Sequence, residues 1–543
     1  MTDGSDPMAP SGAVNPIDTD YKVGQDNIVL NVGPFGLDIH NRVFAISGLL
    51  VVAFVVLTLA FQNQVEPMFT AMRGWLTSNL DWFFISAGNI FVLVCLGLAI
   101  SPLGKVRLGG TEATPDYTYL GWFSMLFAAG MGIGLMFFGV SEPLSHFGSA
   151  FGGTAMENGV RTDWAPLGAA AGDAEAATRL GMAATIYHWA LHPWAIYAIL
   201  ALGLALFSFN KGLPLTVRSV FYPLLGERIW GWPGHLIDIL AVLATLFGLA
   251  TSLGYGAAQA SSGLNFLFDV PLGNTTQIVL VIGITAIALF SVVAGLDAGV
   301  KRLSEINMML AVLLLVFVIA VGPTLDILSG FFGNLGAYFQ HLPALSNPVG
   351  RDDANFSQGW TAFYWAWWIS WSPFVGMFIA RVSRGRTVRE FIVSVLIVPS
   401  LACVLWMTVF GETAIIQFVR DGYEAATKAE LPLQLFAMLD ALPLAQITSF
   451  IAIILVVVFF VTSSDSGSLV IDVIAAGGKV DAPTPQRVFW CVFEGLVAIA
   501  LILGGGLVAL QAMAVSTGLP FTIVLLMSAV AVIKGLASEP RAR

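Results

Sequence analysis

The sequence predicts an all-α integral membrane protein with twelve transmembrane helices, and three observations lead to that prediction. The chain of 543 residues is 57% hydrophobic and only 11% charged, whereas soluble domains carry about 25% charged residues. Its mean hydropathy is +0.83. Apolar runs of about 20 residues, the length needed to cross a bilayer, recur along almost the whole chain.

The predicted spans are separated by polar links that differ in length. They lie at residues 42–62, 81–101, 119–140, 181–207, 235–257, 275–296, 306–328, 358–380, 390–411, 448–475, 486–505 and 511–534. Residues 1–41 are polar and rich in Asp, Pro and Gly, so we expect a disordered cytoplasmic N-terminal tail without a signal peptide. The cysteines Cys95, Cys403 and Cys491 fall in apolar spans and are expected to be core residues, without disulfides.

Lysine and arginine side chains set the expected orientation. With the N-terminus inside, the inner loops hold thirteen of them between Lys105 and Arg487, and the outer loops hold six between Arg73 and Lys428. Basic residues accumulate on the cytoplasmic side of membrane proteins. We therefore expect a multi-pass protein of the bacterial inner membrane with both termini in the cytoplasm.

The third span carries three alternating glycines, Gly130, Gly132 and Gly134. Each glycine weakens a helix by about 1 kcal/mol relative to alanine, and a glycine backbone can lie directly against a ligand. Unwound backbone at membrane depth is tolerated only where it lines a cavity or is buried in protein. The alternative is close packing of helices through small residues. We favour an interrupted helix beside a binding site.

The eighth span contains Pro373, which removes one helical hydrogen bond and clashes with the preceding turn. Two disrupted spans five apart indicate two five-helix repeats of inverted topology. The repeats occupy residues 119–330 and 358–534, after two peripheral helices at 42–118. The remaining parts are an extracellular or interfacial segment at 331–357 and a short cytoplasmic tail at 535–543.

Aromatic side chains crowd two of these spans. They are Trp365, Trp367, Trp368 and Trp371 in the eighth span, and Trp189, Trp194 and Tyr197 in the fourth. An interfacial aromatic belt would place rings at the ends of spans, whereas most of these rings lie several residues inside. Ring faces attract a quaternary ammonium by roughly 0.5–2 kcal/mol per contact. The pattern therefore predicts a box of rings for a small methylated-onium solute.

Oxygen atoms suited to sodium follow in the tenth span, which contains Thr462 and Ser463. The interrupted third span would add the carbonyls of Ala128 and Met131. A Thr–Ser pair alone is weak evidence, because such side chains often bond to their own helix. Beside a broken helix, the pair supports a sodium site.

Carboxylates in or at the ends of the spans are few, and the ones we identify are Glu142, Asp238, Asp465 and Asp472. A proton-coupled carrier uses such a group as its relay, so proton coupling stays an alternative. We expect Asp465 to cap or pair locally. His188 and His192 have the i, i+4 spacing of metal ligands, but without further ligands a packed or hydrogen-bonded pair is favoured.

These motifs resemble those of the betaine/choline/carnitine transporter family. The resemblance rests on Ala128 to Phe137 followed by Glu142 and Pro143, on His188 to Tyr197, and on Tyr364 to Phe374. It extends over nearly all of residues 42–534 and is nearest to the sodium-coupled glycine betaine carriers of the family. The resemblance implies a LeuT-like fold, a homotrimer and alternating access.

The same resemblance implies specific site residues. The substrate box would consist of Trp189, Trp194, Tyr197, Trp367, Trp368 and Trp371, with Trp365 as a nearby wall residue. One sodium ion would be held by the carbonyls of Ala128, Met131 and Phe459 and by the hydroxyls of Thr462 and Ser463. A second sodium position maps onto Thr245, Ser252 and Phe374. Leu249 stands where the family has a threonine, which leaves the sodium stoichiometry open.

Together the residues and the resemblance lead us to expect a sodium-coupled symporter for glycine betaine or dimethylsulfoniopropionate. The substrate carboxylate would meet backbone amides near Gly130, Gly132 and Gly134. We expect no cofactor beyond the coupling sodium ions, no nucleic-acid partner, and contact with membrane lipid. The alternative is a proton-coupled or sodium-independent exchanger for choline or carnitine. An enzyme is not expected, because the sequence shows no nucleophile–base pair and no metal cluster.

Overall fold

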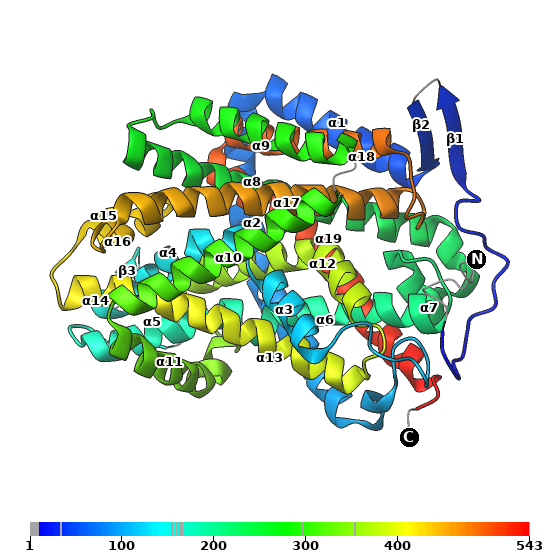
Figure 1. Ribbon diagram of the computed structural model, residues 1–543, viewed down its shortest axis with the longest axis horizontal. Coiled ribbons are helices and arrows are strands. Elements are labelled where there is room, and N and C mark those ends of the chain that lie inside the picture. Colours follow the sequence, from blue (N-terminus) through cyan, green and yellow to red (C-terminus); the bar gives the residue numbers. More distant parts are fainter. Residues whose placement is uncertain are drawn as a thin grey trace.

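A computed structural model describes residues 10–32, 35–153, 156–158, 160–161, 167–168, 170–294, 297–351 and 354–541. Most of its long helices run along the longest axis of the molecule (Figure 1). Two small antiparallel sheets accompany them, formed by β1 (Asn27–Val32) with β2 (Phe35–His40) and by β3 (Met156–Glu157) with β4 (Val160–Arg161).

Helices lie at all twelve segments that the sequence predicts to span the membrane. The first seven segments correspond to α1 (Val43–Ala60), α2 (Gln62–Ile100), the pair α3 (Tyr119–Gly130) and α4 (Ile133–Gly152), the pair α5 (Ala174–Trp189) and α6 (Leu191–Ala205), α8 (Trp232–Phe268), α9 (Asn274–Ala294) and α10 (Asp297–Val321). The last five correspond to α12 (Ala362–Val382), α13 (Val388–Met407), α17 (Ala445–Ala475), α18 (Thr484–Leu503) and α19 (Gly506–Ala537).

Shorter elements connect these helices. The α-helices among them are α7 (Tyr222–Leu225), α11 (Thr324–Leu345), α14 (Thr413–Val419), α15 (Ala425–Lys428) and α16 (Gln434–Asp440). Segments of 3-10 helix lie at Pro102–Lys105, Val217–Phe221, Gly226–Trp230 and Leu431–Leu433, and π-helix at Leu206–Asn210, Ala354–Thr361 and Thr408–Glu412.

Ten helices among the described residues are long and apolar enough to cross a membrane, or eleven when the bent pair α3 and α4 is one span. Helix α12 is not among them, because its tryptophans and serines lower its hydropathy. The chain is therefore a multi-pass membrane protein. The count of twelve spans and the inverted repeat stay predictions.

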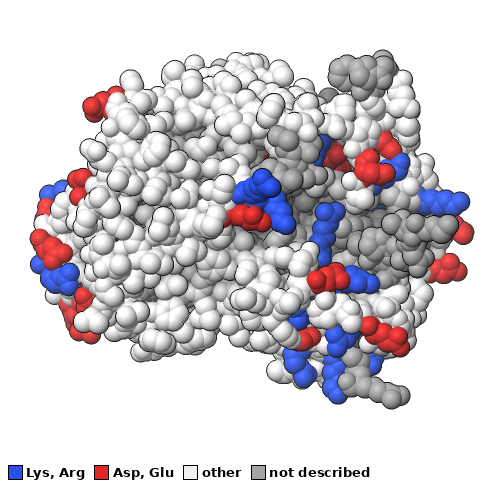
Figure 2. Space-filling view, in the orientation of Figure 1, with Lys and Arg blue, Asp and Glu red and all other residues white. Residues whose placement is uncertain are grey.

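Burial separates a central group of helices from a lipid-facing group. The apolar stretch of α5 and α6 is 94% buried and that of α8 is 83% buried, whereas α1 is 33% buried and α9 and α10 are each 28% buried. The fourth span, which carries Trp189, Trp194 and Tyr197, therefore lies at the centre together with α8. Figure 2 shows charged side chains at the two ends of the long axis and a small group near the middle of this face, with a broad uncharged surface between that group and the left end.

The N-terminal arm differs from the predicted disordered tail. From residue 10 to 41, apart from 33 and 34, it is described, and it docks on loops at one end of the molecule. Tyr21 stacks on Trp230 with ring centroids 3.8 Å apart, and Asp38 forms an ion pair with Lys479. The prediction of disorder rests on composition alone. Composition cannot show that these side chains have partners hundreds of residues away.

The same end of the molecule holds both chain termini (Figure 1). The Asn15 amide group donates to the Ser538 carbonyl, and Lys211 pairs with Glu539 at 2.5 Å. Nearby, burial and the Arg218 guanidinium lower the pKa of His40 to about 3, so this imidazole is neutral at neutral pH. Termini at one end agree with an even number of spans.

Close contact between α4 and α5 generates the first testable prediction. A Cβ atom on Gly181 would lie 2.7 Å from the Phe147 amide nitrogen, so no side chain fits between the two backbones. We expect Gly181→Ala to destabilise the protein by about 1–3 kcal/mol, measured as a lower midpoint of thermal unfolding in detergent. Gly283→Ala in α9 is the matched control, because a Cβ there meets no described atom within 4 Å. Equal midpoints for both variants would contradict this account.

Candidate functional site

One of the central spans is broken by a bend that lines the site, and a second is interrupted at a single residue. Helices α3 and α4 meet at an angle of 63° at Met131 and Gly132, within the predicted glycine motif. The fourth span breaks at Ala190, between α5 and α6, where the backbone leaves the helical region at φ −100° and ψ −120°. Pro193 lies in the first turn of α6, where a missing amide proton costs no hydrogen bond.

The predicted disruption of the eighth span is wrong. Helix α12 continues through Pro373 from Ala362 to Val382. The Ser372 hydroxyl donates to the Ile369 carbonyl at 2.7 Å, the carbonyl for which the proline ring has no amide proton. The serine therefore satisfies the backbone group that proline frees, and the helix stays intact.

Indole rings pack directly against two glycines of the α3–α4 break. A Cβ on Gly134 would lie 2.8 Å from the Trp189 ring, and a Cβ on Gly130 would lie 3.3 Å from the Trp194 ring. A Cβ on Gly132 would meet no described atom within 4 Å. Two glycines thus let the rings lie against the backbone, and the third borders open space.

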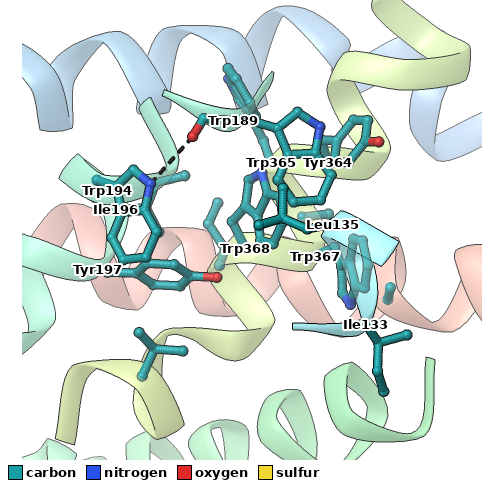
Figure 3. Packing of buried hydrophobic residues seen from close by; sticks show 14 of the residues in the cluster. Ile133, Leu135, Trp189, Trp194, Ile196, Tyr197, Tyr364, Trp365, Trp367 and Trp368 are labelled. Atoms are coloured by element: carbon teal, nitrogen blue, oxygen red, sulfur yellow. Dashed lines mark hydrogen bonds between the residues drawn. The ribbon is translucent and has the colours of Figure 1, made fainter. Parts of the chain in front are cut away.

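That open space is a cavity lined by all six rings of the predicted box. Its lining residues are Ala129, Gly130, Met131, Gly132, Ile133, Gly134, Leu135, Trp189, Pro193, Trp194, Tyr197, Ser252, Trp367, Trp368, Trp371 and Cys403. Rings of Trp367 and Trp368 stack with centroids 5.1 Å apart, and Trp189 meets Trp368 edge to face at 4.9 Å. Figure 3 shows Trp194 and Tyr197 across from Trp368.

Backbone carbonyls hold most of the indole N–H groups of this box. Trp368 donates to the His188 carbonyl at 3.0 Å, and Trp194 donates to the Trp189 carbonyl at 3.3 Å (Figure 3). Trp367 donates to the Gly248 carbonyl at 3.4 Å. With their polar edges bound, the indoles have fixed orientations, and their electron-rich surfaces are available to a positively charged group.

Trp365 lies outside the cavity lining, in contrast to the expected wall position. Its ring stacks on His192 with centroids 5.3 Å apart, and a Cβ on Gly88 would lie 2.7 Å from its Nε1 atom. It therefore packs toward α2. The spacing of the four tryptophans could not separate this ring from the other three, because neighbouring helices cover all sides of α12.

A buried carboxylate next to the box has more partners than the sequence indicates. The Glu142 side chain accepts hydrogen bonds from His188 Nδ1 at 2.6 Å and from His146 Nε2 at 3.2 Å on one oxygen. On the other oxygen it accepts from Trp189 Nε1 at 2.7 Å and from the Tyr364 hydroxyl at 2.6 Å. The cluster joins α4, α5 and α12.

This cluster is also where a metal ion would find ligands, since atoms of Glu142, His146 and His188 lie within 4.8 Å of one another. In the sequence, His188 stands out only through its spacing to His192. The structure separates that pair, because His192 Nε2 bonds to the Asn89 side chain at 3.0 Å. Both histidines are hydrogen-bonded, but not as the expected pair, and His188 has the further potential ligands Glu142 and His146 that the sequence did not indicate.

Two further buried carboxylates, Glu412 and Glu494, are absent from the set picked out in the sequence. Glu412 pairs with Arg179 at 3.2 Å, and one oxygen of Glu494 accepts from the Ser464 hydroxyl at 3.0 Å. Single acidic residues inside long apolar runs are the signal that would have identified them. Asp465 is paired, as expected, but its partner at 3.1 Å is Arg487 on the neighbouring helix α18.

The residues predicted for the first sodium ion lie on the broken span and on α17, which packs against α4. The Thr462 hydroxyl donates to the carbonyls of Val458 at 3.0 Å and Phe459 at 3.1 Å, which leaves its oxygen lone pairs free to accept. Ser463 is half-buried. At the break, the Ala128 carbonyl accepts from the Met131 amide at 3.2 Å.

The residues predicted for a second sodium ion lie on α8 and α12. Thr245 donates to the Ala241 carbonyl at 2.7 Å, and Ser252 donates to the Gly248 carbonyl at 3.2 Å and lines the cavity. The Phe374 ring meets Trp371 with centroids 5.5 Å apart. Leu249 packs toward α17, where a Cβ on Gly467 would lie 2.3 Å from its side chain.

Comparisons with known proteins identify the family of this chain. Residues 42–541 match the model of the BCCT family, the betaine/carnitine/choline family transporters. The chain is 75% identical to a glycine betaine/proline/choline transporter of Vibrio parahaemolyticus, over 98% of this chain and 96% of the relative. It is 54% identical to glycine betaine transporter 1 of the same organism, over 96% and 97%. A glycine betaine transporter of Acinetobacter baylyi is 41% identical, over 92% and 74%.

A solved mutant of a manganese transporter from Eremococcus coleocola covers 79% of this chain and 88% of its own, with 13% identity and a TM-score of 0.41. That similarity is too low to support an argument. The family match and the relatives, in contrast, extend over nearly the whole described bundle. The chain therefore belongs to the betaine/carnitine/choline family of transporters.

Proposed function

We propose that this transporter is a sodium-coupled symporter that imports a small methylated-onium osmolyte by alternating access. The observation that carries this proposal is the cavity at the α3–α4 break, where six aromatic rings surround one space. Rings in this arrangement replace the hydration shell of a permanent cation, at roughly 0.5–2 kcal/mol per contact. Glycine betaine leads as substrate, and dimethylsulfoniopropionate presents the same positive methylated surface.

Names of the relatives support this substrate class and widen it. The two from Vibrio parahaemolyticus described above are named for glycine betaine, and the more similar of the two also for proline and choline. Each of these solutes carries a positively charged nitrogen, which is the group that the rings recognise. In the proposed binding mode, the onium group lies against the rings, and a substrate carboxylate meets the backbone amides around Gly132.

Sodium coupling is proposed from the oxygen atoms near the break. The Thr462 hydroxyl, already donating to its own helix, and half-buried Ser463 would accept a cation together with the carbonyls of Ala128, Met131 and Phe459. The candidate ligands for a second sodium ion are Thr245, Ser252 and Phe374. Leu249 contributes an apolar side chain to this face of α8, so we propose one sodium ion as the minimum stoichiometry.

The proposed setting is a LeuT-like bundle of twelve spans with an inverted repeat, assembled as a homotrimer in the bacterial inner membrane. Both termini would face the cytoplasm. In support, the two termini lie at one end of the molecule, and the named relatives are bacterial. Basic residues also concentrate in the loops of that end, as expected for a cytoplasmic surface.

The proposal as a whole is tested by uptake of radiolabelled glycine betaine into proteoliposomes. We expect saturable accumulation with an inward sodium gradient, and little accumulation when potassium replaces sodium. Accumulation that is equal in both salts would contradict sodium coupling. If a proton gradient alone then drives uptake, the proton-coupled alternative is correct.

Replacing Trp368 by leucine tests the aromatic box. The substitution removes an electron-rich ring and keeps most of the apolar area, so we expect substrate affinity to fall about tenfold, which is within the range of one or two cation–π contacts. Substrate affinity is measured by quenching of tryptophan fluorescence. The control is Trp365→Leu, a buried ring on the same helix outside the cavity, which should lower thermal stability more than affinity. Wild-type affinity in Trp368→Leu would contradict the assignment.

Removing both hydroxyls in Thr462→Ala with Ser463→Ala tests the first sodium site. We expect the sodium concentration for half-maximal uptake to rise about tenfold, which corresponds to about 1.4 kcal/mol, because two of the proposed oxygen ligands are lost. The matched control is Ser468→Ala, one turn further along α17, whose hydroxyl bonds to the Asp465 carbonyl at 3.0 Å. Unchanged sodium dependence in the double variant would place the ion elsewhere.

A further inference from the structure

The carboxylate of Glu142 is buried within the membrane protein, with 0% of its side chain exposed, and it lies directly behind a ring of the box. Ionisable groups at such a depth are expensive to bury and are expected to have a function. Nothing in the onium-binding or sodium-binding sites described above uses this group. Its partners show what it does.

Hydrogen-bond donors occupy all of the acceptor positions of Glu142. A carboxylate offers about four lone-pair sites, and the indole, the phenol and the two imidazoles fill them at 2.6–3.2 Å. An indole N–H can only donate, so the oxygen that Trp189 contacts must accept. The geometry is that of an ionised carboxylate held by its surroundings.

The hydrogen bonds of this cluster can be formed without an imidazolium. His146 and His188 each supply one N–H to the carboxylate, and His188 Nε2 then accepts from the Thr361 hydroxyl at 2.9 Å. The negative charge of the cluster lies on Glu142, behind Trp189. The Phe356 ring lies 5.6 Å from the Arg351 guanidinium and 5.0 Å from the His188 ring.

Trp189 connects this charge to the cavity. Its Nε1 edge donates to Glu142 at 2.7 Å, and its opposite edge lies against Gly134 in the cavity lining. A hydrogen bond to an anion is stronger than one between neutral groups, and it shifts electron density toward the indole ring. A ring that is held in one orientation and made more electron-rich binds a cation better.

We propose that Glu142 is a positioning and specificity-determining residue of the onium box, which acts through Trp189 and favours substrates of net positive charge. This inference rests on the proposed function. A cation such as choline gains the full attraction of the carboxylate. A zwitterion such as glycine betaine gains less, because its own carboxylate is repelled. Glu142 thus sets how well choline competes with glycine betaine.

Glu142→Gln tests the proposal, since it keeps the shape and removes the charge. We expect the KM for choline to rise about tenfold and the KM for glycine betaine about threefold, measured as uptake into proteoliposomes at fixed sodium concentration and pH. Glu142→Asp keeps the charge, so the ratio of the two KM values should stay within about twofold of wild type. A merely structural role would move both KM values by the same factor and would overturn the proposal.

Glu412→Gln is the matched control, because it neutralises a buried carboxylate whose partners are Arg179 and Asn334 rather than the box. The ratio of KM values should not change in this variant. Thermal unfolding in detergent reports whether each variant folds. If wild type transports neither solute, the proposed function fails as well. If wild type transports both and Glu142→Gln leaves the ratio unchanged, only the role of Glu142 is refuted.

Trp189→Phe provides a second route if Glu142→Gln does not fold. It leaves the carboxylate in place and removes the N–H that couples it to the cavity, so choline affinity should fall more than glycine betaine affinity. Where both single variants fold, the double variant should lose clearly less than the two losses combined, because the residues act as a unit. Independent effects, or an unchanged ratio in Trp189→Phe, would refute coupling through the indole.

Discussion

Contact between indole rings and bare backbone is the constraint on which the rest of the site depends. A permanent cation at membrane depth needs rings on several sides, and these rings must come from different helices. Gly130 and Gly134 allow this, since a Cβ atom would lie only 3.3 Å from the Trp194 ring at Gly130 and 2.8 Å from the Trp189 ring at Gly134. The break between α3 and α4 leaves Gly132 beside the cavity between them. The glycine backbone and the aromatic rings therefore line the same cavity.

Hydrogen bonds to indole nitrogens give this arrangement its rigidity. Trp368 is tied to the His188 carbonyl, and the side chain of the same histidine is tied to Glu142, which also holds Trp189. Helices α4, α5 and α12 therefore share one polar cluster directly behind the rings. Movement of any one helix during transport must carry the others or break a charge-assisted hydrogen bond, which stabilises by about 1.5–3 kcal/mol.

Much of this could be predicted from the sequence, because apolar length and residue spacing are local signals. They gave helices at every predicted span and the six rings of the box. The Glu142 cluster could not be predicted, since all of its partners except His146 are 46 to 222 residues away. Local signals also misled: the spacing of the tryptophans did not show that Trp365 faces α2, and the composition of the N-terminal arm did not show that it is docked. The Ser372 hydroxyl, which keeps α12 intact, shows how one side chain can override the effect of proline.

The location of the second break follows from the rings themselves. On an ideal helix, two residues five apart point about 140° away from each other, so Trp189 and Trp194 could not both face one cavity from a straight span. The non-helical backbone of Ala190 lies between them, and the Trp194 indole donates to the Trp189 carbonyl at 3.3 Å. Helix α12 needs no such break, because Trp367, Trp368 and Trp371 fall within about 100° of one another at spacings of one, three and four. The fourth span is therefore interrupted between its rings, whereas α12 is continuous. The difference follows from the angle over which the rings of each helix are spread.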